Sequence, residues 1–213
     1  MQTLVVAARD PMPRQRLGEN RPEERRALIL DRLRTISSTE LAAPDYDALT
    51  RCEDLGVITA SKLDLLLSAH LTWHTEGRDP SFASTETADG VGIVPYFFVR
   101  EPATTTDPLE RRLAWHATDA LTPIFSDLPQ VVSDDAAVCL RAAALAAAGG
   151  DVYALTTMPG HHANAEHFGG YCFVNHAVLL MRLLQEAGRR RNPPTCSIDR
   201  TIHLYAPTFT AHP

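Results

Sequence analysis

Residues 133–187 constrain the fold more than any other part of the sequence. Ser133 followed by Asp134 and Asp135 predicts the start of a helix, because a serine side chain caps free backbone N–H groups and acidic residues suit the positive end of the helix dipole. The alanine-rich stretch that follows ends at Gly149-Gly150, a pair typical of a helix C-terminus. Small side chains along such a helix allow it to lie close against a sheet.

A strand, a loop and a second helix follow this helix. Residues 152–156, Val-Tyr-Ala-Leu-Thr, are a continuous run typical of a strand covered on both faces. Pro159-Gly160 predicts a turn, and residues 173–187 predict a helix that stops at Gly188. This order is typical of an α/β protein with a mostly parallel sheet flanked by helices. Since ligands bind at the loops leaving the carboxyl ends of such strands, residues 158–173 are the expected functional site.

Shorter sequence patterns predict the remaining helices and strands. Residues 4–6 predict a short strand, and residues 20–36 predict a helix with a capping box and an early proline. Residues 61–74 place apolar side chains on one face at helical spacing. Residues 79–107 are rich in Thr, Ser, Pro and Gly, so we expect a long loop with a short strand or buried plug at 94–99.

Composition limits the classes of partner. The 213 residues suffice for one domain. The 20 basic and 26 acidic residues give a net charge of −6. We therefore expect no nucleic acid and no anionic membrane surface as a partner. No apolar run approaches the roughly 20 residues that span a bilayer, and residues 1–16 do not resemble a secretory signal. The four cysteines are far apart, which fits reduced thiols and a cytoplasmic protein; they are Cys52, Cys139, Cys172 and Cys196.

The loop at 158–173 carries two adjacent imidazoles, His161 and His162. Histidines titrate near neutral pH, so such a pair can act as general base and general acid in amide hydrolysis. Gly169-Gly170 would let a substrate approach the backbone, and Tyr171 could form an aromatic wall. Adjacent histidines alone are a weak motif, and a loop with ordinary turn glycines remains the alternative interpretation.

Two linked motifs carry a family resemblance. Residues 158–163, Met-Pro-Gly-His-His-Ala, and residues 169–175, Gly-Gly-Tyr-Cys-Phe-Val-Asn, resemble the PGHHA and GG(F/Y)C(F/Y)xN motifs of the histone deacetylase superfamily. Further segments resemble its acetylpolyamine amidohydrolase branch; these are residues 21–25, the helix leading to Trp73, residues 94–98 and residues 120–124. The resemblance covers about residues 1–190.

The resemblance implies an arginase-like α/β fold and zinc-dependent hydrolysis of an acetylated amine, either an acetylpolyamine or acetyl-lysine, to acetate and the free amine. By position His162 matches the general base of the family and His161 its partner. Gly170 and Tyr171 match residues that line the channel for the acylated side chain. Cys172 matches a buried cysteine near the site.

The sequence departs from the family after Gly188. An Asp-x-Asp-x-His-His-Gly-Asn-Gly pattern, whose Asp and His bind zinc in the family, is not recognisable. Asp199 and His203 lie four residues apart, about 13 Å along an extended strand, too far to share one ion. We therefore assign no metal ligand and expect no tightly bound zinc.

These departures indicate a truncated family member, with a partial deacetylase-like domain at 1–190 and an irregular, non-family tail at 191–213. The sheet would then be incomplete at the C-terminus. We expect it to end at the 152–156 strand, leaving Val152 and Leu155 exposed.

Other hypotheses stay open at this stage. The chain could be a non-catalytic deacetylase-like module that pairs with an intact relative, and self-association into a homo-oligomer is a further option. A third hypothesis makes His161, His162 and His167 a metal-binding cluster without hydrolase activity. His70 and His74, four apart on a predicted helix, have a spacing that can chelate zinc, although packing is the stronger interpretation.

Overall fold

A computed structural model of the chain describes residues 4–8, 22–42, 45, 47–76, 84–87, 90–191 and 202–205. The strands in these residues are β1 (Leu4–Ala8), β2 (Ser38–Ala42), β3 (Ser84–Thr87), β4 (Gly90–Ile93), β5 (Val152–Leu155) and β6 (Ile202–Tyr205). The helices are α1 (Pro22–Arg34), α2 (Asp47–Asp54), α3 (Ala60–Thr75), α4 (Leu109–His116), α5 (Leu128–Ala148) and α6 (His176–Arg191).

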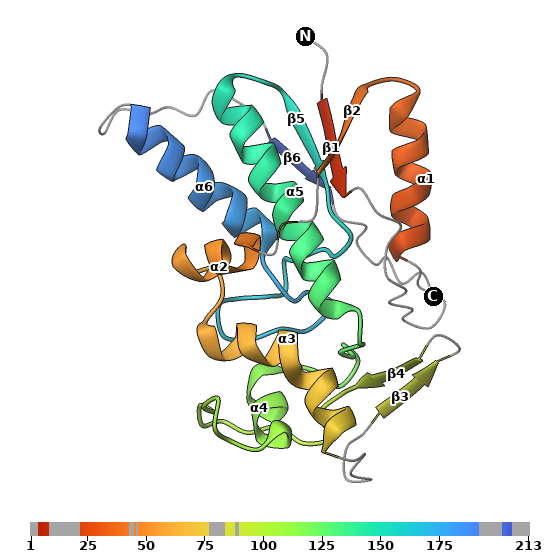
Figure 1. Ribbon diagram of the computed structural model, residues 1–213, viewed down its shortest axis with the longest axis vertical. Helices are drawn as coiled ribbons and strands as arrows, with labels where there is room; N and C mark the ends of the chain where they lie inside the picture. The colour runs from red at the N-terminus through yellow and green to blue at the C-terminus, as the bar shows by residue number, and fades with distance from the viewer. Residues whose placement is uncertain are drawn as a thin grey trace.

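Four strands form a parallel sheet in the order β2-β1-β5-β6 (Figure 1). In register, Leu4 of β1 lies between Ser38 of β2 and Val152 of β5. Strands joined in parallel need crossover connections, and helices supply them here. The predicted parallel sheet flanked by helices is therefore confirmed.

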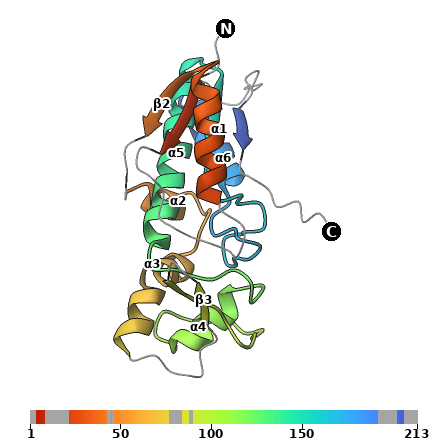
Figure 2. The ribbon, with the colours of Figure 1, turned by 90° about the vertical axis from the view of Figure 1, so that its right-hand side faces the viewer.

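The two faces of the sheet have separate apolar cores. On one face Val5, Ala7 and Leu155 pack against Leu30 of α1. On the other face the alternate side chains of β1 and β5 join a larger core with helices α2, α3, α5 and α6. Because successive side chains of a strand point to opposite faces, each buried strand contributes to both cores. Figure 1 shows the strands between α5 and α1, and in Figure 2 α1 lies in front of them.

The alanine-rich helix α5 begins earlier than the sequence predicts. It starts at Leu128 with Pro129 in its first turn, and it ends at Gly149, whose φ of 114° is left-handed. The prediction of Ser133 as the N-cap is wrong. Ser133, Asp134 and Asp135 lie inside the helix and are buried. A proline in the first helical turn lacks only an N–H that would have no partner there, so it starts the helix without cost.

The sheet does not end at β5. Strand β6 pairs with β5 in parallel, with Ile202 opposite Val152. Val152 and Leu155 are buried rather than exposed, because each packs into the apolar core on its face of the sheet. Within the tail expected to be irregular at 191–213, the four residues of β6 are a strand, whereas 192–201 and 206–213 lie outside the described residues. The division at residue 190 stays a prediction.

Helices α3 and α4 and the β3–β4 hairpin lie beyond the carboxyl ends of the sheet strands (Figure 1). The hairpin falls inside the region expected to be a long loop, and residues 94–99 form no strand. The loop from Thr156 to Asn175 lies between the sheet and this α3–α4 part. None of the helices in the described ranges is both long and apolar enough to cross a membrane.

Candidate active site

The loop between β5 and α6, residues 156–175, holds every residue that the sequence predicts for the site. It leaves the carboxyl end of β5, where ligands of parallel sheets bind. Its turn depends on Gly160, which has a φ of 89°. A Cβ at Gly160 would lie 2.8 Å from the backbone oxygen of Val174, so this position requires glycine for both its conformation and its space.

His161 and His162 lie side by side on the surface of this loop. Their ring centroids are 4.1 Å apart and both side chains are exposed. Partial burial, and next the neighbouring His162, lower the pKa of His161 below its usual value. A neutral His161 imidazole can accept a proton, and both rings have the exposure that a general base requires.

Gly170 lies against the ring of His162. It has a φ of 54°, and a Cβ there would be 2.6 Å from Cδ2 and 2.9 Å from Cγ of His162. A side chain at this position would require the exposed ring of His162 to shift. The structure therefore brings His162 and Gly170, which are eight residues apart in sequence, into direct contact.

Tyr171 follows with the same unusual backbone conformation. Its φ is 61°, the one positive value among the described non-glycine residues. Its backbone N–H donates to Oγ1 of Thr122 at 3.0 Å. Desolvation, and next the charge of Asp119, raise the pKa of the Tyr171 phenol, so the hydroxyl stays protonated at neutral pH. Its side chain is partly exposed, as a channel wall would be.

Asp119 anchors the glycine pair, a role that the sequence did not predict. Its Oδ2 accepts the Gly170 N–H at 2.6 Å and the Thr122 hydroxyl at 3.1 Å. Thr118 fills the space beside Gly169 so completely that a Cβ at Gly169 would collide with its hydroxyl. The anchor lies 51 residues before Gly170, and no local signal connects the two segments.

Asp135 anchors the other end of the loop. One carboxylate oxygen accepts the N–H of Thr157 at 2.7 Å and the other accepts that of Met158 at 2.9 Å. The ring of His176 lies 3.9 Å from the same carboxylate, and both side chains are buried. Burial lowers the pKa of His176, opposed by the Asp135 charge. Asp135 was expected at the start of α5, so its position beneath the loop was missed.

Cys172 lies at the centre of the loop. It is buried, as the resemblance implies, and its Sγ accepts the Gly160 N–H at 3.1 Å. Burial raises the pKa of the Cys172 thiol, although the nearby N–H groups of His162, Gly160 and His161 act in the opposite direction. A thiol with a raised pKa is a poor nucleophile, so Cys172 packs the loop and supports the histidines.

The loop histidines do not form a metal cluster. Across the described residues no three His, Cys, Asp or Glu side chains lie together as a metal site, which contradicts the hypothesis of a His161, His162 and His167 centre. His167 instead packs against Trp115, with ring centroids 4.8 Å apart. Asp199 lies outside the described residues.

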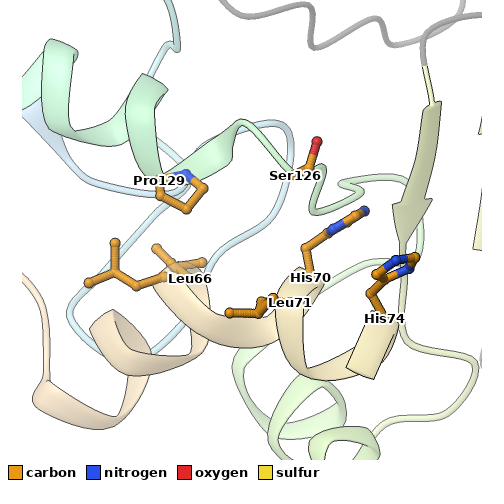
Figure 3. Close-up of a pocket in the computed structure, with 7 residues that line it drawn as sticks. Leu66, His70, Leu71, His74, Ser126 and Pro129 are labelled. Atoms are coloured by element: carbon orange, nitrogen blue, oxygen red, sulfur yellow. The ribbon is translucent and has the colours of Figure 1, made fainter. Parts of the chain in front are cut away.

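The His70 and His74 pair lines an apolar pocket of about 320 Å³ on α3, beside Leu66, Leu71 and Pro129 (Figure 3). Nε2 of His70 is 3.1 Å from the backbone oxygen of Val91, so a hydrogen bond already uses that nitrogen. This favours the packing interpretation of the pair.

Comparison with known proteins gives a consistent set of relatives. The histone deacetylase domain family matches residues 76–192. Acetylpolyamine amidohydrolase 1 of Pseudomonas aeruginosa is 29% identical over 167 residues, which are 76% of this chain and 45% of that protein. Acetylpolyamine amidohydrolase 2 of the same organism is 28% identical over 170 residues, 77% of this chain and 45% of that protein. The chain thus spans a little under half the length of these curated relatives.

A solved structure supports the fold. The acetylpolyamine aminohydrolase from Burkholderia pseudomallei superimposes with a TM-score of 0.68 at 23% identity, covering 87% of this chain and 53% of that one. At this identity the likeness shows the architecture alone.

Proposed function

The chain belongs to the histone deacetylase family, and on that premise we propose that it supplies the proton-transfer histidines and one wall of a site that hydrolyses acetylated amines. The observation that carries the proposal is the contact between Gly170 and the ring of His162. A partly exposed backbone therefore lies directly beside an exposed histidine ring, which supports the proposal. The names of the curated relatives support an acetylated polyamine as the substrate.

In this proposal His162 takes a proton from water as the water oxygen attacks the acetyl carbonyl carbon. The C–N bond then breaks, and a protonated imidazole returns a proton to the leaving amine nitrogen. His161, kept neutral by its lowered pKa, shares these transfers with His162. Gly170 and Tyr171 hold the acylated arm of the substrate, the glycine through its backbone and the tyrosine through its ring.

Zinc is implied by the family resemblance, and the residues described here do not fit it. No group of three potential ligands occurs among them, so no step is assigned to a metal. Hydrolysis also requires that the acetyl carbonyl be polarised. We assign this role to none of the described residues.

A chimera tests the proposal. Residues 1–188 are joined to the C-terminal part of acetylpolyamine amidohydrolase 1 of P. aeruginosa, and acetate release is measured with one acetylated polyamine and one acetyl-lysine peptide. His162→Ala is expected to lose roughly 10² to 10⁴ in kcat/KM. His161→Ala should be similarly severe because the two rings act as a unit. Tyr171→Phe keeps its aromatic surface and should lose far less.

His74→Ala is the matched control, because His74 is an exposed histidine on α3 away from the loop. Equal activity of His162→Ala and the parent chimera would show that the histidine pair is structural. An inactive, folded chimera together with an unaltered chain that binds an intact relative would favour the non-catalytic pairing module instead.

A further inference from the structure

Lys62 is the single lysine of the chain, in which the other 19 of the 20 basic residues are arginine. It lies in the first turns of α3 and has no solvent-exposed surface. Lysine is almost never fully buried without partners. The side chain therefore needs an explanation that the mechanism above does not give.

The ammonium nitrogen of Lys62 contacts the site loop. Nζ donates to the backbone oxygens of Asn164 and His167, both at 2.8 Å. These carbonyls bracket a turn, residues 164–167, which is closed by the Asn164 N–H donating to the His167 oxygen at 3.1 Å. The Asn164 side chain closes it further by accepting the N–H groups of Glu166 and His167.

The other two carbonyls of the turn also have donors from outside the loop. The Thr59 N–H donates to the Ala165 oxygen at 3.0 Å. Nδ1 of His116 lies 2.6 Å from the Glu166 oxygen. All four carbonyls of the turn are thus bound, and Lys62 alone binds two of them. The turn lies between His162 and Gly170 in the sequence, so its conformation contributes to the distance between those residues, together with the Asp119 hydrogen bond of Gly170.

Burial favours a neutral Lys62 amine. Burial lowers the pKa of Lys62 to about 7, and the charges of Glu166 and Cys172 act in the opposite direction. His116 and the backbone of His167 also face the amine. A neutral amine has two N–H groups, which matches the two carbonyl acceptors, whereas an arginine could not lose its proton. This accounts for a lysine at this buried position in a chain that otherwise uses arginine.

We propose that Lys62 is a positioning residue of the site, whose two hydrogen bonds fix the 164–167 turn and thereby hold Gly170 against the ring of His162. Lys62 touches neither substrate nor the reacting atoms. It acts through the loop. The inference relies on the proposed function only for the chemistry that the positioned residues perform.

Nuclear magnetic resonance on the whole chain tests this inference. Because the chain has one lysine, ¹³C-labelled lysine gives a single Cε signal that belongs to Lys62. Its titration midpoint is expected near pH 7, and the carbonyl signals of Asn164 and His167 should move with it. Asn164 and His167 carbonyl signals that do not move with the Lys62 titration overturn the inference.

Lys62→Met removes both donors at similar volume and is expected to shift the Gly170 amide and the His162 ring signals. Ser68→Ala, which removes a hydroxyl bonded within α3 itself, should leave them in place. Unmoved Gly170 and His162 signals in a folded Lys62→Met chain contradict the inference.

If Lys62→Met does not fold, the wild-type titration decides, since Gly170 must follow the Lys62 midpoint. An active His162→Ala chimera would overturn the proposed function and leave these shifts unaffected, so the two failures are distinguishable.

Discussion

Asp135→Ala is the substitution from which we expect the largest loss of stability. The carboxylate is fully buried and accepts the Thr157 and Met158 N–H groups at 2.7 and 2.9 Å. A hydrogen bond to a charged group contributes about 1.5–3 kcal/mol, so losing two corresponds to about 3–6 kcal/mol. Total stabilities of domains are about 5–15 kcal/mol. The variant should therefore lose a large part of its free energy of unfolding.

Urea unfolding followed by circular dichroism measures the effect. Asp135→Asn keeps one carbonyl oxygen as an acceptor and should lose about half as much as Asp135→Ala. The matched control is Ser133→Ala, two residues away on the same helix and equally buried. It loses one neutral hydrogen bond to the Asp45 backbone oxygen, about 1 kcal/mol. If Asp135→Ala and Ser133→Ala lose the same amount, Asp135 does not anchor the loop.

Three further outcomes are expected. Gly170→Ala should lose about 1–2 kcal/mol from its left-handed φ and also shift the His162 ring signals, whereas Gly56→Ala, with a φ of 66° and open space around it, should lose stability without that shift. Burial lowers the pKa of His116 and His176, so below about pH 6.5 the unfolded chain binds more protons than the folded chain. The free energy of unfolding should therefore fall as the pH is lowered from 7 to 5. A free energy of unfolding that does not change over this range would contradict the expectation. The chain dialysed after zinc loading should retain no stoichiometric metal by atomic absorption, and one retained equivalent would refute the assignment of no ligand.

The sequence predicts those parts of the fold whose signals are local. The helix, strand, loop and helix order at 133–187 rests on glycine stops and an apolar run, and the structure has those elements. The predicted stop at Gly188 is wrong, because α6 continues to Arg191. The start of α5 was misplaced because Ser133-Asp134-Asp135 resembles a capping sequence, whereas Pro129 in the first turn is the stronger start. Strand β2, Ser-Thr-Glu-Leu-Ala, has little apolar character and becomes a strand because β1 pairs with it.

The residues of the candidate site are likewise predictable only where their signals are local. His161, His162, Gly170 and Tyr171 lie in two short motifs that a resemblance can identify. The residues that hold them in place were missed, because their contacts cross long stretches of sequence. Lys62 is 102 residues from its partner Asn164. No periodicity or capping rule connects positions at such separations, so only the folded arrangement reveals them.

The anchors of the loop come from three separate parts of the chain. Asp135 of α5 holds its start, Lys62 of α3 holds its middle, and Asp119, after α4, holds its end. These hydrogen bonds run to residues that precede β5, and none of them involves β6. Among the described residues, these hydrogen bonds therefore hold the loop of the histidine pair from segments that precede β5. Replacing the sequence after Gly188 should therefore leave the His161 and His162 ring signals in place, and a large shift of those signals would contradict this.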